Sequence, residues 1–320
     1  MSYFDKRLRL KGFTWKLTLL PSQNKIDPNL SARLVHENPF DVVFQGGFER
    51  IEQLDFFEES LIDFRAQSPN CTIVLSTFKN SSSFLSRLYK LQDRHKFHIL
   101  LNEDPGTLDR PYATNLLRQI NSTHKGLRLL ESLGTQKCIK LRIDQRIGRL
   151  DSLFFVNQLL DDLRPSLGGV QMRIACSSLN TFKSLPAFMS DCLHFGHVKD
   201  LLNYWETVEK NDFETKTREM LGSLEPSAYR LRIHPEFWLT IRYLMSKGHV
   251  LSSSDLYDKL FWLEYGMVVD SVALDHLWQK QPPYFASNYK SLKWLEKNLH
   301  SGFQEMTFVD WWLRTQIGPE

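Results

Sequence analysis

Residues 137–146, KCIKLRIDQR, decide the expected fold of this chain. Charged and apolar residues alternate along them, so a β-strand here would turn Lys140, Arg142 and Asp144 to one face and the apolar side chains to the other. Three charges on one strand face are costly inside a core unless a site uses them. Asp144 comes last, at the carboxyl end of the expected strand, and ligands of open α/β sheets bind at that edge. The stretch therefore predicts a buried strand that ends in a functional site.

Apolar runs before this stretch predict three further strands, at residues 41–45, 71–77 and 97–102. The segments between them show helical spacing of apolar residues, and the longest expected helix spans about residues 112–133. Strands that alternate with helices imply right-handed crossovers and a parallel sheet. The expected fold class is therefore α/β, with a mostly parallel central sheet flanked by helices. Farther along, residues 189–196 predict a strand and 234–247 a helix, whereas the polar residues 212–229 predict an irregular segment.

Composition and motifs exclude several classes of protein. The net charge is +3, which is too small to indicate a nucleic-acid partner. No GxGxxG follows the first expected strand and no GxxxxGK[ST] occurs, so dinucleotide-binding and P-loop folds are disfavoured. The absence of a signal-peptide pattern and of a long apolar window predicts a cytoplasmic protein. The basic and aromatic N-terminal residues are expected to form a solvated arm or edge strand, or to contact an anionic membrane surface.

Seven short segments, taken together, resemble the WavE family of glycosyltransferase-like proteins of bacterial lipopolysaccharide core and capsule synthesis. They follow one another in the order of the family and span about two thirds of the chain. The segments are VFQG (43–46), IVLST (73–77), NEDPG (102–106), NLLRQINSTHKG (115–126), KLRID (140–144), SDCLHFG (190–196) and HPEFW (234–238). The chain departs from the family at Phe78 and at Cys192, where the family has Trp. Neither departure changes a charged group.

The resemblance implies a GT-A-like fold and a nucleotide-sugar-dependent glycosyltransferase. Its expected parts are an N-terminal arm (1–38), a GT-A-like catalytic domain (39–265) and a helical C-terminal extension (266–320). The implied reaction moves a sugar from a nucleotide-diphosphate donor to a glycan or lipid-linked glycan acceptor, with an inverting mechanism. The implied location is the cytoplasm, with a peripheral contact to the inner membrane as an open alternative. A nucleotidyltransferase and a non-catalytic nucleotide-binding scaffold remain alternative functions.

The expected donor site combines two strand ends with one turn of the long helix. Glycine at the end of the first strand would let the backbone approach a ligand, and cations on the fourth strand would contact phosphates. The residues assigned to the donor are Gln45, Gly46, Arg118, Gln119, Ser122, Lys140 and Arg142. GT-A enzymes usually hold a divalent metal ion with an Asp-x-Asp motif, and the matching triplet here, Arg142-Ile143-Asp144, has one carboxylate. Asp144 is therefore the expected ligand of Mn²⁺ or Mg²⁺.

Two carboxylates compete for the role of general base. Glu236 is in the first turn of its expected helix, where the helix dipole favours the ionised form. Asp191 is the alternative base or a ligand of the acceptor hydroxyl. His194 and His234 are expected to contact the acceptor or substrate, or to serve as metal ligands.

Overall fold

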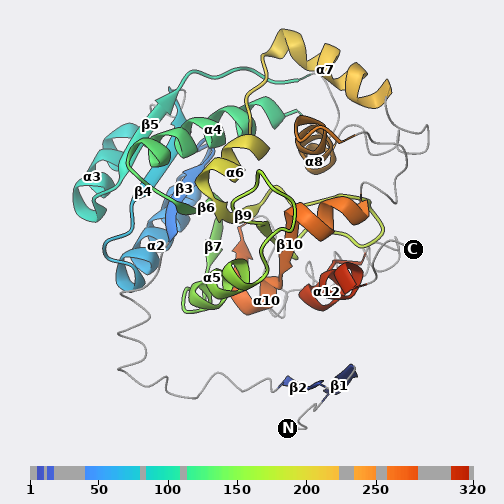
Figure 1. Ribbon diagram of the computed structural model, residues 1–320. Coiled ribbons are helices and arrows are strands. Elements are labelled where there is room, and N and C mark those ends of the chain that lie inside the picture. Colours follow the sequence, from blue (N-terminus) through green and yellow to red (C-terminus); the bar gives the residue numbers. More distant parts are fainter. Residues whose placement is uncertain are drawn as a thin grey trace.

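The computed structural model describes residues 6–10, 13–17, 40–79, 84–108, 114–222, 234–249, 258–279 and 304–316 (Figure 1). Most of the expected N-terminal arm lies outside these residues. Its two described segments, β1 (Lys6–Leu10) and β2 (Phe13–Leu17), pair with each other in an antiparallel manner. The expected membrane contact of this arm stays a prediction.

A seven-stranded sheet forms the centre of the fold, in the order β10-β8-β9-β6-β3-β4-β5. Its strands are β3 (Phe40–Gln45), β4 (Ile73–Phe78), β5 (His98–Asn102), β6 (Lys137–Arg142), β8 (Ile174–Ser177), β9 (Leu193–His197) and β10 (Gly266–Val269). Neighbouring strands are parallel except on the two sides of β9, which runs antiparallel to β6 and β8. The predicted α/β class with a mostly parallel sheet is confirmed.

Adjacent residues of β3 point to opposite faces of the sheet, and apolar residues lie on both. Helices cover both faces. Phe44 packs edge-on against Phe57 of α2 (Ile51–Gln67), with ring centroids 5.1 Å apart. Val43 faces α4 (Leu116–Ser132), where a Cβ on Gly126 would lie 2.3 Å from its Cγ2 atom. Glycine at this position therefore lets α4 lie close to the sheet.

The remaining helices complete the two layers. In Figure 1, α4 and α6 lie together on one face of the sheet, and α2 and α3 contact each other beyond the other face. The described bounds are α3 (Leu85–His95), α5 (Ser152–Asp162), α6 (Val198–Tyr204), α7 (Lys210–Gly222), α8 (Pro235–Ser246), α10 (Ser271–Leu274) and α12 (Phe308–Gln316). None of the helices in the described residues is long and apolar enough to cross a membrane.

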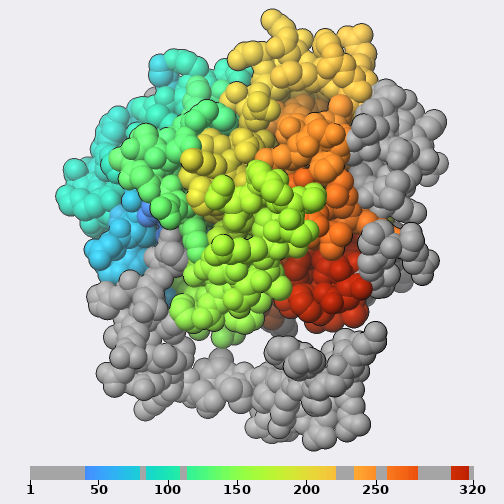
Figure 2. Space-filling model, in the orientation of Figure 1, coloured from blue at the N-terminus to red at the C-terminus, as the bar shows by residue number. Residues whose placement is uncertain are grey.

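The C-terminal segment supplies more than the expected helices. The boundary expected after residue 265 falls directly before β10, which pairs in parallel with β8, so the central sheet continues past that boundary. A π-helical turn (Phe261–Tyr265) leads into β10, and α12 packs on both, because the Trp311 indole donates to the carbonyl oxygens of Trp262 (3.0 Å) and Gly266 (3.1 Å). Figure 2 shows α12 against the 258–279 segment on one face of the molecule. The helical region at the C-terminus is confirmed, with a sheet strand added to it.

The prediction of an irregular segment over residues 212–229 is wrong for its first half, which is α7 (Lys210–Gly222), and residues 223–229 lie outside the described part. Helix α7 is mostly polar, and it packs against α8 through few apolar side chains. Phe213 stacks on Trp238 of α8 with ring centroids 5.1 Å apart, and the Trp238 indole donates to Thr217 Oγ1 at 3.0 Å. A helix with so few apolar residues leaves no clear periodic pattern in the sequence, so α7 could not be predicted from periodicity.

Candidate functional site

Three segments that are distant in the sequence meet at the carboxyl edge of the sheet. Gln45 and Arg142 end the parallel strands β3 and β6 and are register partners. Because β9 runs antiparallel to β6, the residues that precede β9 reach the same edge, and they include Asp191. Asp144 is the second residue after β6. The strand ends therefore gather the polar residues that the sequence predicted there.

Arg142 and Asp144 form a bidentate ion pair. The Nε and Nη2 atoms of Arg142 donate to Asp144 Oδ1 and Oδ2, each at 3.0 Å. Trp278 donates its indole N–H to Oδ2 at 3.0 Å, and its ring centroid lies 5.4 Å from the guanidinium carbon. Asp191 Oδ2 is 3.9 Å from Arg142 Nη1. Burial alone would lower the pKa of Arg142, but its attraction to Asp144 and Asp191 outweighs that effect, so the guanidinium stays charged.

This arrangement does not fit the expected metal site at Asp144. A ligand carboxylate must offer lone pairs to the cation, and both oxygens of Asp144 already accept hydrogen bonds from Arg142. The nearest cation is the guanidinium itself, and a metal ion bound there would meet a like charge. Within the described residues, no group of three or more His, Cys, Asp or Glu side chains is placed to hold a metal ion.

Lys140 is fully buried behind this pair. Its Nζ donates to the backbone carbonyl oxygens of Asp191 and Cys192, and it lies 4.7 Å from the centroid of the Trp205 ring. Burial lowers its pKa to about 8. The ammonium group was expected to contact the donor, but it is enclosed by protein atoms. Lys140 can therefore act on a ligand only through its charge and by holding the segment that carries Asp191.

His194 is a structural residue in this arrangement, which corrects the expected contact with substrate or metal. The Trp205 indole donates to Nδ1 at 3.0 Å, so Nε2 carries the proton and donates to the Ser190 carbonyl oxygen at 2.7 Å. Burial lowers the pKa of this imidazole to about 3, so it stays neutral. Neither ring nitrogen is left for a ligand. His234 is placed differently, directly before α8, where its half-buried ring packs edge-on against Phe188.

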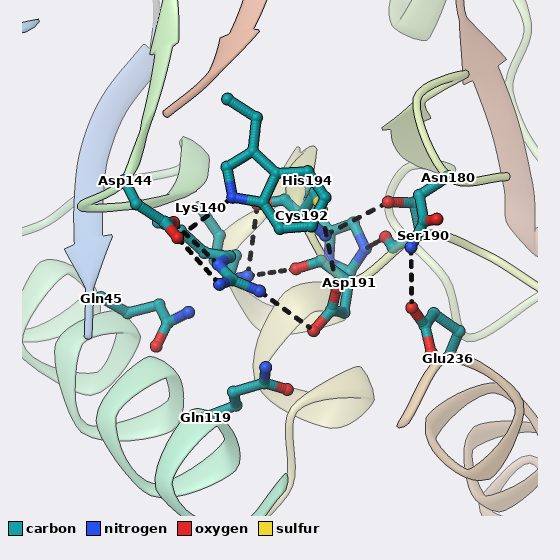
Figure 3. Close-up of polar contacts among 12 residues, drawn as sticks. Gln45, Gln119, Lys140, Asp144, Asn180, Ser190, Asp191, Cys192, His194 and Glu236 are labelled. Carbon is teal, nitrogen blue, oxygen red and sulfur yellow. Dashed lines mark hydrogen bonds and ion pairs between the residues drawn. The ribbon is translucent and has the colours of Figure 1, made fainter. Parts of the chain in front are cut away.

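Glu236 is a buried carboxyl group with one oxygen left over (Figure 3). Its Oε1 accepts a hydrogen bond from Asn180 Nδ2 at 3.2 Å, whereas its buried Oε2 has no hydrogen-bond partner among the described residues. Burial and the nearby carboxylate of Asp191 raise its pKa to about 8. The first turn of α8 was expected to keep Glu236 ionised, but burial outweighs the helix dipole. At neutral pH the side chain therefore carries a proton.

The amides assigned to the donor lie beside α4. Ser122 Oγ donates to Gln45 Oε1 at 3.1 Å, and Gln119 is one turn earlier on the same helix. The Gln119 Oε1 atom is buried and makes no hydrogen bond with the described residues. In Figure 3 no dashed contact joins the Gln45 or Gln119 side chains to the charged cluster, which consists of Lys140, Arg142, Asp144 and Asp191. These two amides thus retain hydrogen-bonding capacity next to the strand ends.

Gly46 and Arg118 have more specific structural roles. Gly46 has a φ of +132°, a conformation that L side chains rarely adopt, and a Cβ there would lie 3.1 Å from Ile143 Cγ1. Arg118 forms a bidentate pair with Asp104, with N–O distances of 2.8 and 2.6 Å. The site therefore needs glycine after Gln45 for backbone reasons, and the charge of Arg118 is already balanced by the loop after β5.

Two residues of the cluster were missed by the sequence interpretation. Trp278 reaches Asp144 because β11 (His276–Trp278) pairs with β7 (Gln145–Ile147), and the two residues are 134 positions apart. Asn180 reaches Glu236 across 56 positions from a turn where its φ is +67°. No local pattern links residues at such separations.

The opposite, amino edge of the sheet contains a cavity of about 530 Å³. Its lining includes Arg65, Cys71 and His98, and it includes none of the expected site residues. Each nitrogen of the Arg65 guanidinium donates there: Nε to the carbonyl of His95, Nη1 to those of Pro69 and Cys71, and Nη2 to that of Lys96. This arginine joins the ends of α2 and α3 and uses four of its five N–H groups to do so.

Comparisons with known proteins give a family match and distant structural likenesses. A family model described as WavE lipopolysaccharide synthesis matches residues 40–239. No curated protein matches the chain. Among solved structures, the nucleoside-diphosphate-sugar pyrophosphorylase from Vibrio cholerae RC9 is similar with a TM-score of 0.36 and 12% identity, over 75% of this chain and 95% of that one.

Proposed function

The chain belongs to the WavE family of lipopolysaccharide synthesis, and on that premise we propose that it is a GT-A-type glycosyltransferase. The proposed reaction transfers a sugar from a nucleotide-diphosphate donor to a glycan or lipid-linked glycan acceptor. It inverts the anomeric centre and takes place at the cytoplasmic face of the inner membrane.

The observation that carries this proposal is the state of Glu236. Buried polar groups in proteins are nearly always hydrogen-bonded, yet Glu236 keeps one buried oxygen without a partner among the described residues. Its pKa is raised to about 8, near the pH at which a cytoplasmic enzyme works. A carboxylate with such a pKa is a stronger base than an ordinary one and is still ionised in roughly a tenth of the molecules at pH 7. These properties support Glu236 as the group that takes the proton of the acceptor hydroxyl.

The neighbouring residues supply the other requirements of sugar transfer. The departing diphosphate needs positive charge, and Arg142 presents a guanidinium at the end of β6. The amides of Gln45 and Gln119 are proposed to bind the donor's nucleoside or sugar hydroxyls. Asp191 faces both Arg142 and Glu236, and it is the alternative base or a ligand of the acceptor hydroxyl. His234, directly before α8, is proposed to contact the acceptor.

A transfer assay with a panel of donors tests the proposal. The full chain is incubated with UDP-, GDP- and CMP-sugars and with rough lipopolysaccharide as the acceptor, and free nucleotide and extended glycan are measured by chromatography and mass spectrometry. We expect one donor to be consumed with stoichiometric sugar transfer. A nucleotidyltransferase would instead produce or consume pyrophosphate, and a scaffold would bind a nucleotide without turnover. Failure of every nucleotide to bind would exclude a nucleotide-sugar enzyme.

A further inference from the structure

The Arg142 guanidinium lies where a donor's phosphates would meet the sheet. Arg142 and Gln45 are register partners at the carboxyl ends of two central parallel strands. Ligands of open α/β sheets bind outside these strand ends. The side chain of Arg142 is 16% exposed, so the guanidinium is held by the protein and is still reachable.

The contacts of Asp144 serve to hold this guanidinium in place. Each of its oxygens accepts one hydrogen bond from Arg142, and Trp278 fixes the carboxylate from a third direction. The Trp278 ring also lies against the guanidinium, 5.4 Å from its central carbon. A cation bound to these oxygens would have to break both Arg142 hydrogen bonds and would meet a like charge.

The charges of the cluster are already balanced by side chains. Lys140 and Arg142 bring two positive charges to the two carboxylates, Asp144 and Asp191, whereas Glu236 is protonated at neutral pH. A divalent ion between two carboxylates would give the same net charge of zero. The two side-chain cations thus supply the positive charge that a metal ion would bring.

One donor atom of Arg142 remains available. Nε and Nη2 bind Asp144, whereas Nη1 is 3.9 Å from Asp191 Oδ2, a distance longer than a hydrogen bond. Within the described chain Nη1 donates no hydrogen bond to the protein. Guanidinium N–H groups form short, charge-assisted hydrogen bonds to phosphate oxygens.

From these contacts we infer that Arg142, supported by the charge of Lys140, neutralises the donor's departing diphosphate in place of a divalent metal ion. The inference rests on the proposed function, because it concerns the same donor. In the reaction, the acceptor oxygen bonds to the anomeric carbon and its proton passes to Glu236. The electron pair of the broken sugar–oxygen bond stays on the diphosphate, and Nη1 of Arg142 donates to a phosphoryl oxygen. Asp144 is a positioning residue that acts through Arg142.

Calorimetric titration of the full chain with UDP, GDP and CDP, in EDTA and in Mn²⁺, tests the inference. We expect the preferred nucleoside diphosphate to bind with dissociation constants that agree within about threefold in the two conditions. Electron paramagnetic resonance of Mn²⁺ added to the protein alone gives a second readout. The signal of free Mn²⁺ should persist at stoichiometric protein.

Variants separate the arginine from a metal site. Arg142→Ala should weaken nucleotide binding about 10- to 100-fold, in EDTA and in Mn²⁺ alike. Because this change leaves Asp144 buried without its counter-charge, the double variant Arg142→Met/Asp144→Asn removes both charges and should show the same loss in a folded protein. Asp144→Asn alone should weaken binding only about 3- to 10-fold and leave it resistant to EDTA. Arg146→Ala is the matched control, since Arg146 pairs with Glu59 and Asp63 outside the site.

The outcomes distinguish the inference from the function. Nucleotide binding that needs Mn²⁺ and disappears in Asp144→Asn would overturn the inference and leave the glycosyltransferase proposal intact. Equal binding by the wild type and by the Arg142 variants would also overturn it. Absence of nucleotide binding in both EDTA and Mn²⁺ would remove the proposed function and the inference together.

Discussion

The two edges of the central sheet both carry charged groups, but their hydrogen bonding differs. At the amino edge, every nitrogen of the Arg65 guanidinium donates to a backbone carbonyl. At the carboxyl edge, Glu236 and Gln119 each keep a buried oxygen without a partner in the described chain, and Arg142 keeps a nitrogen. A buried polar group without a partner costs about 1–3 kcal/mol unless water, an ion or a ligand completes the hydrogen bond. At the amino edge, His95 Nε2 is such a group among the described residues. The carboxyl edge gathers more of them around charged side chains, and the proposed site uses that edge.

The largest effect should come from Glu236→Gln. This change keeps the shape and the Asn180 contact of the side chain but removes its ability to accept a proton. Sugar transfer should fall at least about 100-fold, as is typical for a lost catalytic base, while the protein stays folded by circular dichroism. Transfer at the wild-type rate would exclude Glu236 as the base and leave Asp191.

Glu264 provides a matched control for this change. It is 6% exposed, as Glu236 is, but both of its oxygens are used, by the backbone N–H groups of Ser166 and Leu167 and by the Ser166 hydroxyl. Glu264→Gln should cost about 1–3 kcal/mol of stability and leave transfer per folded molecule nearly unchanged. If both variants behaved alike, the unpartnered oxygen of Glu236 would have no special significance.

A change at the amino edge should affect stability without affecting activity. Arg65→Ala removes a charged group that joins the ends of α2 and α3 through four carbonyls, some of which water can reach after the change. We expect a loss of about 2 kcal/mol in the free energy of unfolding, measured with urea, and nucleotide affinity within about twofold of the wild type. A large loss of affinity with normal stability would place a ligand site at the amino edge instead.

Local sequence patterns were sufficient to predict the parts of the carboxyl edge that depend on strands. Alternation in residues 137–146 predicted a strand with Lys140 and Arg142 on one face, and β6 carries both side chains into the cluster. The parallel arrangement then places the end of β3 beside the end of β6, which brings Gln45 next to Arg142. Short-range periodicity and chain direction determine these features, and both are visible in a sequence.

The state of each side chain depends on partners that no local pattern contains. Asp144 was expected to hold a metal ion, and the tryptophan that fixes it belongs to a strand 134 residues away. The helix start predicted an ionised Glu236, but its pKa is set by burial and by Asp191, which come from the tertiary fold. His194 was expected to contact the substrate or a metal ion, but the indole of Trp205 donates a hydrogen bond to one of its ring nitrogens.

The pH dependence of transfer should distinguish the two candidate bases. Burial raises the pKa of Glu236 to about 8, so its basic form becomes tenfold scarcer for each unit of pH below that value. The value of kcat/KM should therefore rise with pH up to about 8, by about tenfold per unit. It should fall again above that pH, because burial lowers the pKa of Lys140 to about 8 and its charge is then lost. A rate that stays level down to about pH 6 would exclude Glu236 as the base.

Stability measurements give the pKa of Glu236 without any substrate. The folded pKa of about 8 is higher than the ordinary value of 4.5, so the folded protein binds this proton more tightly than the unfolded chain does. The resulting stabilisation is fully present below pH 4.5 and is lost as the pH rises to about 8. The wild type should thus lose stability relative to Glu236→Gln by about 1 kcal/mol per pH unit across this window. If the unfolding free energies of the wild type and of Glu236→Gln differed by the same amount at every pH in this window, Glu236 would be ionised throughout it.

The smallest effect should come from Ser122→Ala, which tests whether the amide of Gln45 is used by the donor. The hydroxyl of Ser122 lies 3.1 Å from Gln45 Oε1 and 2.7 Å from the Arg118 carbonyl, so its removal costs one weak contact and frees the amide to rotate. Donor affinity should fall about two- to fivefold, with less than about 1 kcal/mol of stability lost. Ser132→Ala is the control, because Ser132 makes a similar hydroxyl-to-carbonyl bond on the exposed side of α4. Equal affinity in the two variants would mean that the donor does not contact Gln45, and the functional edge would then be narrowed to the charged cluster and Glu236.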